Sequence, residues 1–264
     1  MKGNNVSMSP YNFSDNNPVM MVDPDGNDAD IWLVNAETGE TSYVEDGSQD
    51  VVVLNDMNYT AATSIASGSY NENVSRIAGF IYDAAISRGD RLVANADGMV
   101  ELPADNPNSR NGSYTFEGKV LFNHFNRNDE SGPEDQWGEA SVVADLIGAV
   151  VEYNQSYSDV VNIGDMKSPG NGMVNAGWKY HHGDAGAFDA RFLGDAGSIN
   201  GGGRPSMVNV QKTQAFINAL GNHNFTRIIL PGDLRGRGLH GSGSMSIKWD
   251  MTSGHDNHYH VDRH

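Results

Sequence analysis

The strongest constraint on the fold of this chain is a change in its apolar pattern near residue 138. Val142, Leu146 and Val150 recur with apolar neighbours at helical spacing, which predicts a helix over 139–154 with one buried face. Further elements are predicted downstream: strands at 159–165, 188–193, 227–230 and 257–262, and a helix from Ser206 to Leu220. This order predicts an α+β domain over residues 138–264, with a small antiparallel β-sheet flanked by helices.

The part of the chain before residue 138 is less regular and strongly acidic. Residues 1–160 hold seven Lys and Arg against 26 Asp and Glu, whereas residues 161–264 hold ten against eight. A hairpin is predicted over 31–54, a helix near 73–88 and a short strand at 115–122. We assign no chemistry to residues 29–137 and interpret them as an irregular, acidic adaptor or linker.

Composition excludes several classes of function. The chain has no cysteine, so disulfide scaffolds, thiolate metal sites and cysteine nucleophiles are ruled out. Its net charge of −17 over 264 residues argues against a nucleic-acid partner. No apolar run is long enough to span a membrane, and the first residues lack the apolar stretch of a signal peptide. We therefore expect any export signal to lie outside this sequence.

Histidine is concentrated at the C-terminal end. Eight of the nine histidines lie between residues 181 and 264, a segment without glutamate. Within the predicted strand 257–262, His258 and His260 share one face, because alternate side chains of a strand point the same way. Such a pair, with His255 shortly before it, is typical of a site in which a metal ligand lies beside a catalytic base. Histidine pairs also occur on solvated strands.

A second polar pattern precedes the strand predicted at 188–193. His182 is followed, after a turn of mostly small residues, by Asp189, so that a loop histidine can fold back beside a strand carboxylate. Together with one more imidazole, this pair would complete a three-ligand zinc site with an open position for water. His181 and Asp184 are alternative ligands, because the doubled histidine leaves the choice open.

Three arginines are candidates for a role near this site. Arg191 shares a strand face with Asp189, which makes it a candidate supporting residue. Arg235 and Arg237 lie in a glycine-rich loop and could clamp a substrate carboxylate, but a solvated loop is the favoured interpretation.

The first residues resemble a known family. The segments 9–13, 16–19 and 22–26 read SPYNF, NNPV and VDPDG, and in this order they resemble the end of the RHS-repeat-associated core. The resemblance covers about 20 residues and implies that residues 1–28 are a remnant of a β-rich shell. In that family a variable effector, often a toxin, follows the shell.

A second resemblance covers roughly residues 140–264. The run IGDMKSPGNG at 163–172, then His182 and Asp189, then His255, His258 and His260 are similar to the penicillin-insensitive murein endopeptidases. These enzymes belong to a zinc group that includes lysostaphin-type peptidases, D-Ala-D-Ala carboxypeptidases and the hedgehog domain. The resemblance implies that His182, Asp189 and His260 bind Zn²⁺, that His258 is catalytic, and that His255 is a further active-site histidine.

The chain also departs from this family. The histidine before His182 is shifted in the lead-in sequence, and Ala187 stands where the family has a second aspartate. We expect the zinc site to survive both changes, while the bond that is cleaved stays open.

These patterns together predict a zinc metallopeptidase that acts on the peptides of peptidoglycan. We expect it to be an RHS-type effector that is secreted, or delivered to the periplasm or wall of a competing bacterium. An immunity protein is a possible partner. Two alternatives stay open: a D,D-carboxypeptidase with the same metal site, and a zinc-binding module without catalysis. A nuclease toxin is disfavoured by the acidic chain.

Overall fold

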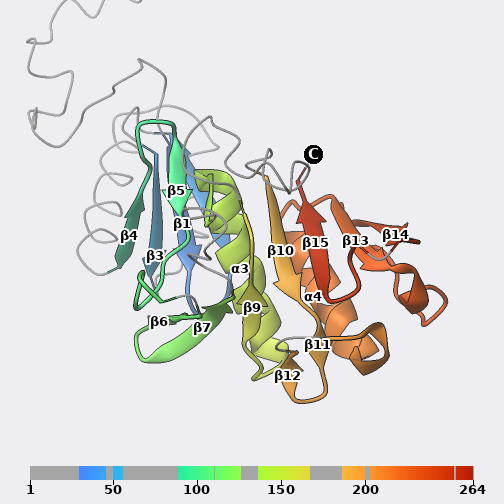
Figure 1. Cartoon of the computed structure of the whole chain (residues 1–264). Coiled ribbons are helices and arrows are strands. Elements are labelled where there is room, and N and C mark those ends of the chain that lie inside the picture. The colour runs from blue at the N-terminus through green and yellow to red at the C-terminus, as the bar shows by residue number, and fades with distance from the viewer. Residues whose placement is uncertain are drawn as a thin grey trace, which may run out of the picture.

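The computed structural model describes residues 30–45, 50–55, 89–109, 111–125, 136–166, 186–199, 203–252 and 254–263 (Figure 1). The segment 1–28, the helix predicted near 73–88 and the loop with His181, His182 and Asp184 lie outside these residues. The described part is mixed α/β, with two α-helices and mostly β-sheet, which is compatible with the predicted α+β class. Neither of the described helices is long and apolar enough to cross a membrane.

The largest sheet has seven strands in the order β14-β13-β15-β10-β9-β7-β6 (Figure 1). Its strands in chain order are β6 (Ser113–Phe116), β7 (Lys119–His124), β9 (Val161–Ile163), β10 (Ala187–Arg191), β13 (Arg227–Pro231), β14 (Ser246–Asp250) and β15 (His258–Asp262). The pairs β13–β14 and β7–β9 are parallel and the others antiparallel, so the sheet is mixed and larger than the antiparallel sheet expected from the sequence. A parallel neighbour requires a long crossover connection. The glycine-rich segment between β13 and β14 provides this crossover. Strand β14 was not predicted from the sequence.

Two helices cover the apolar face of this sheet. Helix α3 (Ala140–Ser156) agrees with the helix predicted over 139–154, but every residue from Val142 to Val151 is buried, so the helix is covered on all sides rather than on the one face expected. Helix α4 (Val210–Asn222) starts later than predicted, because the side chain of Asn209 caps it by accepting a hydrogen bond from the Lys212 amide at 3.0 Å. Ser206, the predicted cap, lies instead in a short 3₁₀ turn that begins with Pro205.

Strands β10 and β15 present their apolar residues to these helices. Phe188 and Ala190 of β10 and Tyr259 and Val261 of β15 are all buried in the core. The Tyr259 hydroxyl lies 2.7 Å from the hydroxyl of Thr213 on α4, which ties β15 to that helix. Because side chains alternate along a strand, the polar residues between these positions share the opposite face of the sheet.

A second sheet of four strands comes from the region expected to be irregular. Its order is β2-β1-β3-β4, with β1 (Asp30–Asn35), β2 (Thr41–Glu45), β3 (Val51–Asn55) and β4 (Asp90–Val93). Strands β1 and β2 form an antiparallel hairpin in the first part of the range 31–54 predicted for one, whereas β3 joins β1 in parallel. The Asn35 side chain closes the turn by accepting hydrogen bonds from the amides of Glu37 and Thr38.

The remaining short strands form two two-stranded sheets. Strand β5 (Met99–Glu101) pairs with β8 (Trp137–Glu139), and β11 (Leu193–Gly194) pairs with β12 (Gly197–Ser198). The short strand predicted at 115–122 is a hairpin of β6 and β7 instead, which turns at Glu117 and Gly118, both with positive φ. Glycine adopts this backbone conformation without steric cost, which explains its place in the turn.

One hydrophobic core contains residues from both sides of residue 138. Val34 and Val52 of the four-stranded sheet belong to the same buried cluster as Val150 of α3 and Val261 of β15. Strands β6 and β7, which precede residue 138, lie in the same sheet as β10 and β15. The division at residues 137 and 138 stays a prediction, but the sheet that carries the candidate site contains strands from both sides of it.

Candidate metal centre and histidine cluster

The polar face of strands β10 and β15 brings four of the predicted site residues together. In the antiparallel register Asp189 lies opposite His260, and Arg191 lies opposite His258. The rings of His255 and His258 are 5.2 Å apart, measured between their centroids, so the loop before β15 brings His255 to the same place. His182, the third predicted zinc ligand, and its alternatives lie outside the described residues.

His260 is held between two carboxylates. Its Nδ1 lies 2.9 Å from Oδ1 of Asp189, and its Nε2 lies 2.9 Å from Oδ1 of Asp262. Burial by itself would lower the pKa of His260, but the hydrogen bonds and negative charges of the two carboxylates outweigh it and raise the pKa to about 9. Without a bound cation, the imidazole of His260 is therefore protonated at neutral pH and balances this negative charge.

Asp262 has a second cationic neighbour. Its other carboxylate oxygen accepts a hydrogen bond from Nε of Arg227 on the adjacent strand β13. Burial would raise the pKa of Asp262, but the hydrogen bonds from His260 and Arg227 hold it well below its usual range. Asp262 is thus an ionised acceptor that fixes the orientation of the His260 ring.

His258 has a different electrostatic environment from His260. Its Nε2 lies 3.6 Å from Oδ2 of Asp189, and its Nδ1 lies 2.7 Å from Oδ1 of Asn257. Burial lowers the pKa of His258 below its ordinary value, and the negative charge of Asp189 only partly opposes this effect. A neutral imidazole at physiological pH can accept a proton, which is what a general base requires.

His255 is oriented by a carboxylate that the sequence patterns did not reveal. Its Nδ1 lies 2.7 Å from Oδ2 of Asp250, at the end of β14. Asp250 is itself fixed, because its Oδ1 accepts hydrogen bonds from the amide and the hydroxyl of Thr252. The hydrogen bond from His255, followed by that from Thr252, holds the pKa of Asp250 well below its usual range.

The sequence patterns did not reveal the groups that orient the cluster. Asn257 makes the contact with His258, whereas the neighbouring Asp256 is exposed. Asp250 and Asp262 were not singled out from the sequence. Asp262 alternates with His260 along β15, and Asp250 lies only five positions before His255, so spacing along the chain could have identified both.

The donor set of the described residues fits a metal with nitrogen and oxygen ligands. Asp189 and Nδ1 of His260 face each other, and the second nitrogen of His260 is held by Asp262. A metal-bound histidine commonly has its other ring nitrogen held by a carboxylate in this way, which leaves the first nitrogen free to coordinate. No group of three potential ligands is arranged around one point within the described ranges. The predicted set of three requires His182.

The arginine candidates occupy distinct environments. The guanidinium carbon of Arg191 lies 4.0 Å from the centroid of the Phe125 ring, and burial lowers the pKa of Arg191 although Asp165 and Asp189 oppose that shift. Arg237 donates hydrogen bonds to backbone carbonyls of the segment before α4, so it supports the loop. Arg235 is exposed to solvent, as favoured from the sequence.

Comparison with known proteins does not identify a family for this chain: no family model and no curated protein matches it.

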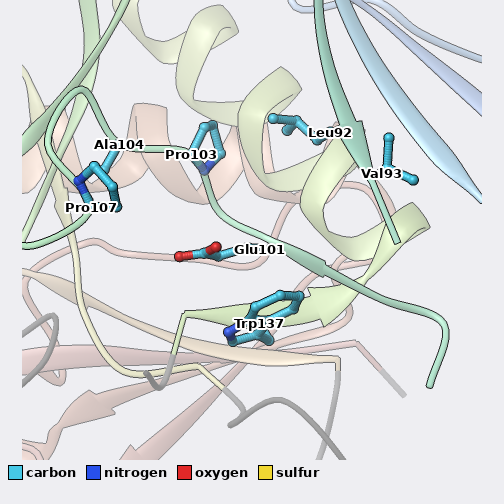
Figure 2. Close-up of a pocket in the computed structure, with 7 residues that line it drawn as sticks. All are labelled: Leu92, Val93, Glu101, Pro103, Ala104, Pro107 and Trp137. Atoms are coloured by element: carbon cyan, nitrogen blue, oxygen red, sulfur yellow. The ribbon is translucent and has the colours of Figure 1, made fainter. Parts of the chain in front are cut away.

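A separate hollow lies between β4, β5 and β8 and has a volume of about 330 Å³ (Figure 2). It is mainly apolar, with Leu92, Pro103 and Trp137 among its lining residues and Glu101 as its one carboxylate. None of its lining residues belongs to the histidine cluster.

Proposed function

We propose that this protein is a zinc-dependent peptidase that cleaves peptide bonds in the stem peptides or cross-links of peptidoglycan. The observation that carries the proposal is the arrangement of Asp189 and His260 around a common point, with His258 beside them on the same sheet face. The resemblance of the histidine motifs to murein endopeptidases supports the choice of reaction and substrate.

In this proposal His182, Asp189 and His260 hold the zinc ion. Bound zinc supplies a Lewis acid that polarises the scissile carbonyl and acidifies an attacking water. Asp189 contributes negative charge, and the two histidines would bind as neutral rings. Asp262 keeps Nε2 of His260 occupied, so Nδ1, which faces Asp189, is the nitrogen that would bind the cation.

His258 acts as the proton carrier. Its burial favours the neutral ring, so it can accept the proton of the attacking water as the new C–O bond forms. When the C–N bond breaks, the same ring returns that proton to the leaving nitrogen, and the imidazole is neutral again. His255, held by Asp250, stands beside His258 and fixes the local arrangement of rings.

The biological setting is part of the proposal. The RHS-like residues 1–28 favour an antibacterial effector that is secreted, or delivered to the periplasm or wall of a target bacterium. An immunity protein would then be its natural partner.

The test is mass spectrometry of muropeptides after incubation of purified peptidoglycan with the protein, with and without a chelator. Chelator-sensitive conversion of cross-linked dimers to monomers is expected. His258→Ala should retain zinc and lose turnover. Loss of only a terminal alanine would make the protein a D,D-carboxypeptidase, and bound zinc with no wall product would make it a zinc-binding module and overturn the peptidase proposal.

A further inference from the structure

The position of Arg191 suits it to bind part of the substrate, provided that the proposed peptidase function is correct. We propose that Arg191 binds a carboxylate of the substrate, on the residue that supplies the leaving nitrogen. Arg191 lies on the same face of β10 as Asp189 and opposite His258 on β15. The charge of its guanidinium acts on both the candidate metal ligand Asp189 and the candidate proton carrier His258.

The guanidinium of Arg191 is held in a way that leaves its donors available. Its carbon lies 4.0 Å from the centroid of the Phe125 ring, so the ring supports its flat face. The N–H groups of a guanidinium point outward from its edge and match the two oxygens of a carboxylate. In the described part of the chain these N–H groups make no hydrogen bond, although Arg191 is half-buried.

Other arginines on this half of the chain use their guanidinium groups in fixed contacts. Arg227 donates to Asp262, Arg237 donates to the carbonyls of Pro205 and Val208, and Arg263 forms an ion pair with Asp145. Arg191 differs from them because it is anchored by an aromatic ring rather than by an acceptor. An arginine that is positioned and also has free donors is suited to bind an anion.

The described carboxylates near Arg191 accept no hydrogen bond from it, so its donors stay available to a carboxylate of the substrate. Asp165 and Asp189 are its negatively charged neighbours, and Asp189 is assigned to the metal in the proposed function. In stem peptides, a terminal D-alanine carries its carboxylate one carbon away from the nitrogen that leaves. The diamino acid of many cross-links has the same arrangement. Arg191 would bind that group while His258 protonates the adjacent nitrogen.

The experiment compares two synthetic peptides that differ only at this carboxylate, one as the free acid and one as its primary amide. Steady-state cleavage of both is measured with the zinc-loaded wild type, Arg191→Gln and Arg191→Lys. The wild type should prefer the acid. Arg191→Gln should raise KM for the acid by about 10- to 100-fold and change KM for the amide by less than about 2-fold. The KM of Arg191→Lys for the acid should lie between those of the wild type and Arg191→Gln, because lysine keeps the charge.

Arg204→Gln is the matched control, because it removes the same charge from an exposed position and should leave both peptides unaffected. Equal cleavage of acid and amide by the wild type would overturn the inference, even if a variant failed to fold. An equal loss on both peptides in Arg191→Gln would overturn it as well. In either case the peptidase function would stand. Failure of the wild type to cleave either these peptides or intact peptidoglycan would instead overturn the proposed function.

Discussion

At the scale of single residues, the site consists of histidine rings whose orientation is set by neighbouring oxygen atoms. The contacts are His260 with Asp189 and Asp262, His258 with Asn257, and His255 with Asp250. An imidazole has two different nitrogens, so the partner of one nitrogen decides what the other can do. The orienting residues should therefore affect metal binding and proton transfer without touching the substrate.

Asp262→Asn tests this idea at the proposed metal centre. The amide has nearly the same size but no negative charge, so it should hold the His260 ring less firmly. We expect the affinity for Zn²⁺ to fall by about 10- to 100-fold, measured by competition with a chromogenic chelator. Asp233→Asn, in an exposed turn, is the control. Unchanged zinc affinity in a folded Asp262→Asn protein would contradict the assigned role.

A double-mutant cycle tests whether Asp250 acts through His255. If Asp250 acts only through His255, Asp250→Ala should reduce kcat/KM by about 10-fold, and adding it to His255→Ala should cause no further loss. Zinc content and melting temperature are measured alongside to separate positioning from folding. Additive losses in the double variant would show that Asp250 acts independently of His255.

At the scale of elements, strand β15 is the one on which the site depends most. It carries His258 and His260 on one face and Tyr259 and Val261 on the other, between its neighbours β10 and β13. The Tyr259 hydroxyl accepts a hydrogen bond from the Leu193 amide at 3.1 Å, in addition to its contact with α4. Burial, which outweighs these hydrogen bonds, raises the pKa of Tyr259 to about 12, so the hydroxyl stays neutral.

Tyr259→Phe should reveal how firmly β15 is held. The Leu193 amide and the Thr213 hydroxyl would each lose a buried partner, so the free energy of unfolding should drop by about 1–3 kcal/mol. Chemical denaturation measures the change, and Tyr43→Phe, which alters an exposed ring, is the control. A loss below about 0.5 kcal/mol would mean that water replaces the missing hydroxyl.

At the scale of the whole molecule, α3 connects the upstream sheet to the half of the chain that carries the site. A Cβ atom at Gly148 would lie 2.6 Å from the carbonyl oxygen of Gly39 and 2.6 Å from Cε1 of His223. Glycine thus allows the β1–β2 turn and the end of α4 to approach the same point of the helix. His223 is buried there, with its Nε2 3.1 Å from Oε2 of Glu152.

His223 should make stability depend on pH. Burial lowers its pKa in the folded state below the ordinary 6.5, although the charges of Asp145 and Glu152 oppose the shift. As pH falls below 6.5, the unfolded chain gains a proton that the folded protein does not yet bind, so this contribution to stability is present at pH 7.5 and decreases toward acid. Unfolding free energies at pH 7.5 and pH 5.5 measure the decrease.

The matching variant for this pH effect is His223→Gln, which removes the titrating ring. It should show a smaller loss of stability between the two pH values than the wild type. His260 contributes with the opposite sign: its folded-state pKa of about 9 adds stability below 6.5 that is lost as pH rises through 9. Equal pH dependence in wild type and variant would mean that His223 is not the responsible group.

The sequence by itself determined the local parts of this protein. The apolar spacing predicted α3, and alternation placed His258 and His260 on one face of a strand, as found in β15. These predictions succeed because the periods of helix and strand depend only on neighbours along the chain. The start of α4 was missed because the Asn209 side chain, rather than Ser206, satisfies the free amides at its N-terminus.

Only the tertiary structure decided which of these parts meet. The contact between Asp189 and His260 joins residues 71 positions apart, and it depends on the antiparallel register of β10 and β15. Arg191 is placed by the ring of Phe125, which belongs to a distant part of the chain. Strand pairing is set by core packing over the whole sheet, so no local pattern in the sequence could specify these contacts.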